Sequence, residues 1–248
     1  MGKKYKNPPV VEALCEFQFV PGQPWDLTLP GLIYEKIKDE FPVKKQQIGI
    51  DVQFRPTEKG VEHKAEPAPP RIQFHKKDKT ALIQVAPDLL VINQLKPYPS
   101  WNKFKPMIVK GFQIYTEVAN PKGLRKIGLR YINIIEFDKT PLELKDYFYY
   151  YPFIPDTLPQ LHDSFLTRIE FPHEKGKERL IITLASLIPK KPEIVSILLD
   201  LDYVMTTPEY ISLNEVPEWL GKAHKRVEEA FEACITDKTR KIFKEEKS

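Results

Sequence analysis

Alternation between polar and apolar side chains recurs along this chain, and it restricts the fold more than any other feature. In the stretch GLRYINIIEF, residues 128–137, Arg130 falls on one side of an extended chain and Tyr131 on the other. Successive side chains of a β-strand point to opposite faces of the sheet. Strands of this kind predict an antiparallel sheet with one packed face and one solvated face.

The solvated face is expected to carry both signs of charge. Its predicted members are Glu12, Glu16, Gln18, Asp51, Gln53, Arg55, Arg71, Gln73, His75, Arg130, Arg168, Glu170, Asp200 and Asp202. A surface that grips nucleic-acid phosphates is predominantly basic, so this mixed face disfavours nucleic acid as its partner. Two interpretations stay open: a set of cross-strand ion pairs, each of which contributes little when exposed, or a mixed-charge binding groove.

Weak internal repeats indicate a duplication. PTEKG at 56–60 recurs as PHEKG at 172–176, and PSW at 99–101 recurs as PEW at 217–219. Apolar residues at helical spacing predict long helices over 100–118 and 216–235. Each half then reads β-α-βββ(β)-α. We predict an α+β fold in which the duplicated unit forms one antiparallel sheet, with helices on one face and a polar opposite face.

The predicted organisation is a single domain with a pseudo-two-fold axis. Residues 1–124 form the first pseudo-repeat and 125–236 the second. Residues 237–248 form a charged C-terminal tail.

Two asparagines interrupt apolar rows of the predicted strands. Asn133 alternates with Tyr131 and Ile135, and Asn93 alternates with Val91 and Leu95. A buried amide without partners costs about 1–3 kcal/mol. Side chains that bind loop backbone are the favoured explanation, because buried polar groups are usually satisfied internally. Contact with a ligand or partner is the alternative.

Other candidate sites are less distinctive. The acids of DLD, Asp200 and Asp202, share one face of a strand, but no spacing supplies a third oxygen ligand, so a metal is not favoured. His224 lies beside the apolar stripe of its helix, without a nucleophile and an orienting group to make it a catalytic base. The aromatic segment YFYYYPFIP, 147–155, includes Tyr149, Tyr150 and Tyr151, which fit either an interface or a cover over the core.

Composition sets broad limits. A formal net charge of +4 from 38 basic and 34 acidic residues is too small to indicate nucleic-acid binding by itself. Two cysteines, Cys15 and Cys234, make no disulfide framework or zinc spacing. No apolar run is long enough for a membrane span. We expect a cytoplasmic protein without a cofactor.

Several stretches resemble a sporadically distributed prokaryotic family of uncharacterised proteins of similar length. They are NPPVVEALCEF (7–17), VAPDLLVINQLKPYPSW (85–101), IGLRYIN (127–133), LDLD (199–202) and EWLGKAHKRVEEAFEACITDKTRKIF (218–243). The resemblance spans nearly the whole chain in the same order. It implies genes in mobile accessory loci, such as defence or toxin-associated operons.

The favoured hypothesis is a non-enzymatic binding protein with a protein partner or small ligand; a homodimer is left open. Its candidate contacts are Glu12, Asn93, Arg130, Asn133, Tyr149, Tyr150, Tyr151, Asp200 and Asp202. A nucleic-acid-associated defence factor and an enzyme with a carboxylate/His site are the alternatives.

Overall fold

The computed structural model describes residues 4–57, 60–138, 142–160, 163–188, 191 and 193–245, and only the backbone of 48–57 and 60–69. The described strands are β1 (Val10–Val20), β2 (Val43–Thr57), β3 (Gly60–His75), β4 (Ala81–Ala86), β5 (Leu89–Leu95), β6 (Gly123–Phe137), β7 (Leu166–His173), β8 (Glu178–Leu187) and β9 (Val195–Met205). The α-helices are α1 (Leu29–Ile37), α2 (Trp101–Ala119), α3 (Leu144–Tyr147), α4 (Val216–Cys234) and α5 (Asp237–Phe243).

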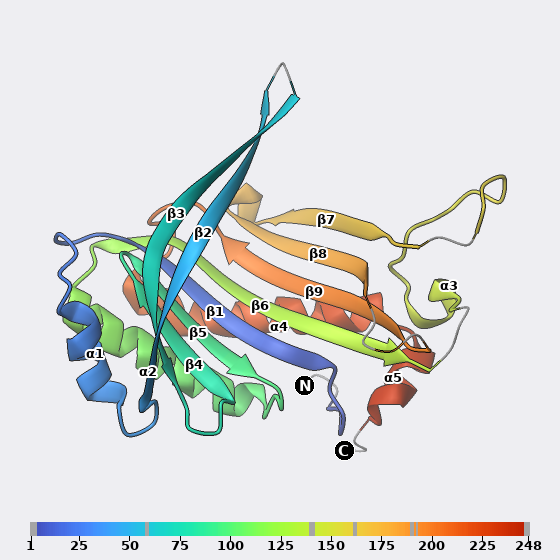
Figure 1. Ribbon diagram of the computed structural model, residues 1–248. Coiled ribbons are helices and arrows are strands. Elements are labelled where there is room, and N and C mark those ends of the chain that lie inside the picture. The colour runs from blue at the N-terminus through green and yellow to red at the C-terminus, as the bar shows by residue number, and fades with distance from the viewer. Residues whose placement is uncertain are drawn as a thin grey trace.

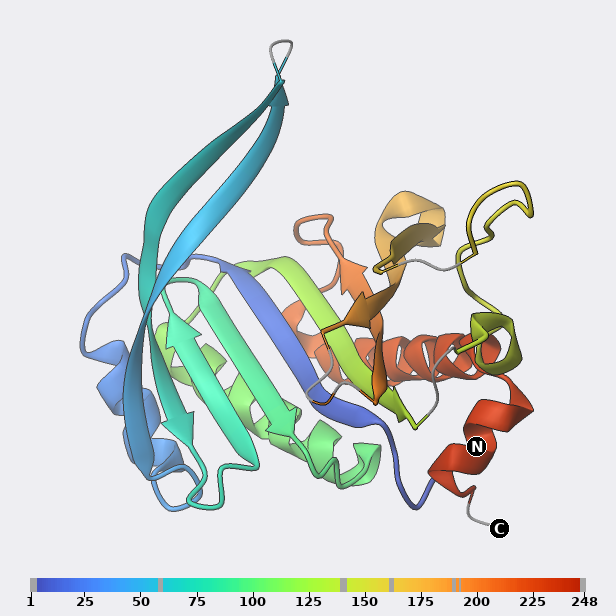
Figure 2. The ribbon, with the colours of Figure 1, turned by 45° about the vertical axis from the view of Figure 1, so that its right-hand side comes forward.

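The nine described strands make one antiparallel sheet, in the order β2-β3-β4-β5-β1-β6-β9-β8-β7. The α+β class and the single antiparallel sheet are therefore confirmed. The first strand of each predicted half, β1 and β6, lie side by side at the centre, with Leu14 opposite Arg130. The long β2–β3 hairpin leaves the sheet and projects beyond the rest of the molecule (Figures 1 and 2).

Helices α1, α2 and α4 lie behind the sheet in Figure 1. The residues that face them are apolar at alternate positions, as in Ala13, Cys15, Phe17 and Phe19 of β1, which are all fully buried. Burial of a large side chain such as Phe17 or Phe19 stabilises the fold by about 1.5–3 kcal/mol. Rings from the strand and from α2 stack directly, since Phe19 lies 4.4 Å from Tyr115 between ring centroids.

Helix α2 packs very closely on the sheet, and one glycine permits this. A Cβ atom built on Gly111 would lie 2.7 Å from Cδ1 of Ile92 in β5. The helix ends where Asn120 takes a left-handed conformation, with φ of 44°, and its N–H bonds the carbonyl of Thr116. Such a left-handed cap satisfies a carbonyl that the helix itself leaves unpaired.

The segment predicted as a charged tail contains a packed helix. In α5, Thr239 and Phe243 are buried. Phe243 lies 5.6 Å from Tyr5 between ring centroids, and the N–H groups of Lys6 and Asn7 bond carbonyls at the end of α5. These contacts fasten the two ends of the described chain to each other.

Candidate functional site

The sheet face opposite α2 and α4 carries a continuous row of polar side chains, which we call the polar row. Its described members are Gln47 of β2, Gln73 and His75 of β3, Gln84 of β4, Asn93 of β5, Glu12 and Glu16 of β1, Lys126 and Arg130 of β6, and Asp200 and Asp202 of β9. Asp51, Gln53 and Arg55, which were predicted on this face, lie outside the described side chains. The polar row thus brings together five of the predicted contact residues from four adjacent strands, β5, β1, β6 and β9. They are Glu12, Asn93, Arg130, Asp200 and Asp202.

One half of the polar row is a relay of amides that ends on a carboxylate. Gln73 Nε2 donates to Gln84 Oε1 at 3.1 Å, and Gln84 Nε2 donates to Asn93 Oδ1 at 2.9 Å. Asn93 Nδ2 then donates to Glu12 Oε1 at 2.6 Å. Aligned hydrogen bonds polarise one another. The relay therefore fixes Glu12 in place, and its other carboxylate oxygen has no hydrogen-bond partner among the described residues.

The face predicted for Asn93 is wrong. The side chain lies on the polar face, because the residues of β5 that face the helices are Leu90 and Ile92, both fully buried. Asn93 is buried there to 3% exposure by its hydrogen bonds to Gln84 and Glu12. Asn93 was expected on the packed face because it alternates with the apolar residues Leu89, Val91 and Leu95. Those three residues lie on the polar face instead, since this central strand carries apolar side chains on both of its faces.

The other half of the row is charged. Arg130 Nε donates to Asp200 Oδ1 at 2.8 Å, and Nη2 donates to Oδ2 at 2.5 Å. This side-chain pairing raises the pKa of Arg130. Asp200 is 8% exposed as a residue. On the neighbouring strand, Lys126 Nζ donates to Glu16 Oε1 at 3.0 Å.

Asp202 is the exception on this face. It pairs in register with Arg130, yet its carboxylate has no hydrogen bond or ion pair to a described residue. Burial raises its pKa from 3.8 to about 6, against the opposing attraction of Arg130 and Lys126. Nη1 of Arg130 likewise makes no hydrogen bond within the described chain. The centre of the polar row thus offers one acceptor and one donor side by side.

The remaining predicted contacts lie elsewhere. Asn133 is on the helix side, where its Nδ2 donates to the carbonyl of Leu199 at 3.0 Å. Leu199 lies opposite Asn133 in β9, so the partner is strand backbone and not the loop backbone that was predicted. Its Oδ1 is buried without a partner among the described residues. Tyr149 is 66% exposed, Tyr151 is 38% exposed, and the Tyr150 hydroxyl is buried. All three follow α3 near the C-terminal end of α4, where Tyr149 N–H bonds the carbonyl of Cys234.

His224 also lies on the helix side, away from Asp200 and Asp202. Its ring is 4.2 Å from that of Trp101 and 6.0 Å from that of Tyr131, between centroids. Burial lowers the pKa of His224 to about 4, so it is neutral at pH 7. The sheet separates it from the carboxylates, and the geometry does not assemble a carboxylate/His pair from these three residues.

Sequence reasoning missed a buried acid. Glu178 of β8 is fully buried and accepts hydrogen bonds from Tyr203 Oη at 2.5 Å, Trp219 Nε1 at 3.0 Å and Lys222 Nζ at 2.8 Å. It alternates with Leu180, Ile182 and Leu184. An acid in an apolar row is the same signal that singled out Asn133, and it was available in the sequence.

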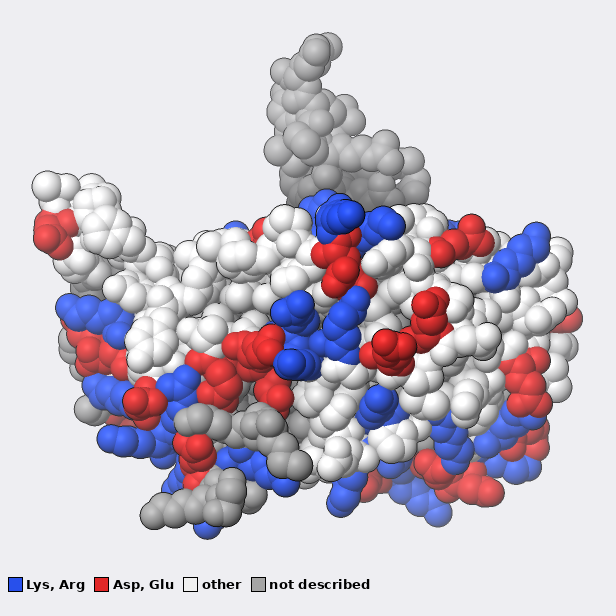
Figure 3. All heavy atoms as spheres, turned by 180° about the vertical axis from the view of Figure 1, so that it is seen from behind, with Lys and Arg blue, Asp and Glu red and all other residues white. Residues whose placement is uncertain are grey.

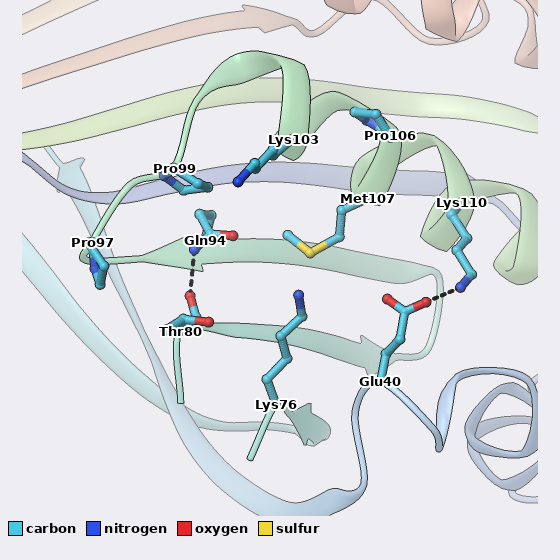
Figure 4. Close-up of a pocket in the computed structure, with 10 residues that line it drawn as sticks. All are labelled: Glu40, Lys76, Thr80, Gln94, Pro97, Pro99, Lys103, Pro106, Met107 and Lys110. Carbon is cyan, nitrogen blue, oxygen red and sulfur yellow. Dashed lines mark hydrogen bonds and ion pairs between the residues drawn. The ribbon is translucent and has the colours of Figure 1, made fainter. Parts of the chain in front are cut away.

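A hollow of about 490 Å³ opens between the N-terminal half of α2 and the ends of β4 and β5 (Figure 4). Its lining is Glu40, Lys76, Thr80, Gln94, Pro97, Pro99, Lys103, Pro106, Met107 and Lys110. Lys110 pairs with Glu40, while Lys76 and Lys103 have no carboxylate partner among the described residues. In Figure 4 the amino group of Lys76 extends toward Met107, and that of Lys103 extends toward Pro99 and Gln94. The lining therefore combines Met107 and three prolines with two lysines that have no carboxylate partner among the described residues.

Charge elsewhere is mixed. Figure 3 shows basic and acidic side chains interspersed over the face behind the sheet, without a large area of one sign. Among the described residues, no three His, Cys, Asp or Glu side chains group closely enough to hold a metal ion. No helix in the described part of the chain is long and apolar enough to cross a membrane.

Comparisons with known proteins give little. No protein-family model matches the chain, and no curated protein matches it. One solved structure that matches is the S. pombe Pct1 RNA triphosphatase, at 9% identity, with 95% of this chain and 83% of that chain covered and a TM-score of 0.17. A likeness at this TM-score carries no argument about fold or function.

Proposed function

We propose that this chain is a non-enzymatic binding protein whose polar row receives a polar protein segment or small ligand. The observation that carries the proposal is the pair of unused groups at its centre: the Asp202 carboxylate and Arg130 Nη1. A partly buried carboxylate without hydrogen bonds to the protein costs stability. Groups of this kind persist where function requires them, because activity and stability trade against each other.

The chemistry of the centre selects the kind of occupant. Asp202 accepts hydrogen bonds and favours a cation or an N–H donor, while the free edge of the Arg130 guanidinium favours a carboxylate or carbonyl oxygen. Glu12, fixed by the amide relay, adds a second acceptor. A polypeptide backbone with a basic side chain, or a zwitterionic small molecule, offers this combination.

The test is native mass spectrometry of the protein isolated from its own host. Wild-type protein should carry a bound partner or ligand, and Asp202→Asn should lose it while its circular dichroism stays unchanged. Glu218→Gln is the matched control, because Glu218 is an exposed acid on α4, on the other side of the sheet. Retention of the same occupant by Asp202→Asn and Arg130→Gln would refute this function.

The genomic setting and the duplication belong to the same proposal. The sequence resemblance supports a gene in mobile accessory loci, in which small binding proteins accompany defence or toxin systems. The central placement of β1 beside β6, with five strands in one half and four in the other, supports an origin by duplication followed by the gain or loss of one hairpin strand.

A second candidate function is the binding of an anion in the hollow beside α2. The observation that favours it is a lining in which Lys76 and Lys103 have no carboxylate partner and lie among Met107 and three prolines, which suits a carboxylate or phosphate with a short apolar portion. Inorganic phosphate should raise the midpoint of thermal unfolding of wild type, and not of Lys76→Ala/Lys103→Ala. Lys96→Ala, an exposed lysine outside the lining, should respond as wild type does.

A further inference from the structure

The outer edge of β7 is apolar and pairs with no other described strand. In Figure 1, β7 is the last strand of its side of the sheet. Leu166 is 70% exposed, and Ile169 and Phe171 are each 43% exposed. An exposed edge strand with large apolar side chains is a template for pairing with another strand, and proteins usually cover or block such an edge.

The backbone groups that face this open edge can be assigned. Ser186 N–H of β8 bonds the carbonyl of Phe165. In an antiparallel pair, residues that exchange hydrogen bonds alternate with residues that do not. Thr167, Ile169 and Phe171 therefore bond β8, while the N–H and C=O groups of Leu166, Arg168 and Glu170 point outward. Pro172, which lacks an N–H, falls at an outward position too, and it ends the pairing edge.

The charges on the outward positions are self-complementary. Arg168 and Glu170 are two residues apart on the same face, and Arg168 Nη2 already lies 2.7 Å from Glu170 Oε1. An antiparallel strand whose two-fold axis passes through Ile169 would place Arg168 opposite Glu170 of the other strand, twice. An axis through Arg168 or Glu170 would instead place like charges opposite each other, which is destabilising.

We infer that β7 pairs with β7 of a second copy of this chain, antiparallel and centred on Ile169, so that two sheets join into one. Arg168 and Glu170 exchange backbone hydrogen bonds with Glu170 and Arg168 of the other copy. Ile169 meets Ile169 at the axis, and Phe171 packs beside Thr167. The contact is isologous, as in most homodimers. Because one strand pair buries little area, the dimer dissociates in the range of about 1–100 µM.

A pair of charge variants tests the inference. Arg168→Glu places two acids on each edge strand, and Glu170→Arg places two arginines, so each variant alone should sediment as a monomer. An equimolar mixture of the two should recover the wild-type dimer as a heterodimer, since every acid then faces an arginine. A role within one chain, such as the pairing of Glu170 with Arg179 at 3.2 Å, cannot produce recovery on mixing.

A cysteine variant tests the register. Directly opposed residues in a pair without hydrogen bonds lie about 4.5 Å apart between Cα atoms, within disulfide reach. Mild oxidation should cross-link Ile169→Cys as a dimer and leave Thr167→Cys monomeric; Cys15 and Cys234 are buried and do not interfere. Wild type that stays monomeric up to about 1 mM, single charge variants that dimerise as wild type does, or cross-linking of Thr167→Cys instead would each overturn the proposal. So would pairing of β7 with a strand of a different protein.

Discussion

At the residue scale, Asp202 is partly buried and has no hydrogen-bond partner in the described chain. Its folded-state pKa of about 6 lies above the ordinary 3.8, so folding favours the protonated form. The stabilisation from protonated Asp202 is complete below pH 4 and is lost as pH rises through 6. Asp202→Asn imitates the protonated carboxyl. It should therefore be more stable than wild type by about 1–3 kcal/mol at pH 7.5.

This gain should shrink toward zero as the pH falls to 4, which urea unfolding at several pH values would show. Asp156→Asn serves as the control, since Asp156 is an exposed acid in a loop. If Asp202→Asn is less stable than wild type at pH 7.5, the ionised Asp202 carboxylate stabilises the fold. That result would contradict its interpretation as an unsatisfied group kept for binding.

Arg130, unlike Asp202, is expected to stabilise the fold, because it is the hydrogen-bond partner of the Asp200 carboxylate. The Arg130 side chain is 42% exposed, while the Asp200 side chain is 10% exposed. Arg130→Ala leaves that carboxylate uncompensated, and the free energy of unfolding should fall by about 1–3 kcal/mol, between the values for exposed and fully buried pairs. Lys36→Ala breaks an exposed pair with Glu117 and should cost about 0–1 kcal/mol. Equal losses for the two variants, measured by urea unfolding, would contradict this account.

At the element scale, Glu178 attaches α4 to the sheet. Trp219 and Lys222 come from the first turns of α4, Tyr203 comes from β9, and all three donate to this one buried carboxylate. Glu178→Ala leaves the three donors without their acceptor and should lower the free energy of unfolding by about 3–5 kcal/mol. Hydrogen exchange should then be fastest in residues 216–223. Tyr203→Phe removes one donor and should cost about 1–2 kcal/mol. An unchanged exchange rate in α4 would show that the apolar stripe alone holds the helix.

The sequence predicts elements of this fold better than it predicts its site. Alternation identified the strands, the covered rows of β1 and β6, and the polar character of Glu12, Arg130, Asp200 and Asp202. It misplaced Asn93, because a central strand carries apolar side chains on both faces, and then period two no longer marks the packed side. The amide relay could not be predicted, since it depends on the register among β3, β4, β5 and β1. Register is set by pairing between strands far apart in the chain.

At the scale of the whole molecule, the central β1–β6 pairing joins the two halves. Ala13, Cys15 and Phe17 of β1 and Ile127 and Leu129 of β6 belong to one continuous core, and all are fully buried. No separate core exists for either half among the described residues. Because a shared core couples the halves, the chain should unfold in one transition, as single domains do.

Three tryptophans make this testable, since Trp25 and Trp101 lie in the first half and Trp219 in the second. Trp101 packs against His224 of α4 and would report on both halves. Trp101→Phe/Trp219→Phe therefore leaves Trp25 fluorescence, which reports on the first half, and Trp25→Phe/Trp101→Phe leaves Trp219 fluorescence, which reports on the second. Within each variant, the urea midpoint from fluorescence should coincide with the midpoint from far-ultraviolet circular dichroism. The comparison is internal to each variant, so the stability lost by removing the Trp219–Glu178 hydrogen bond does not affect it. If the first-half and second-half probes depart from the circular dichroism in opposite directions, the halves are independent domains and β1–β6 is only a contact between them.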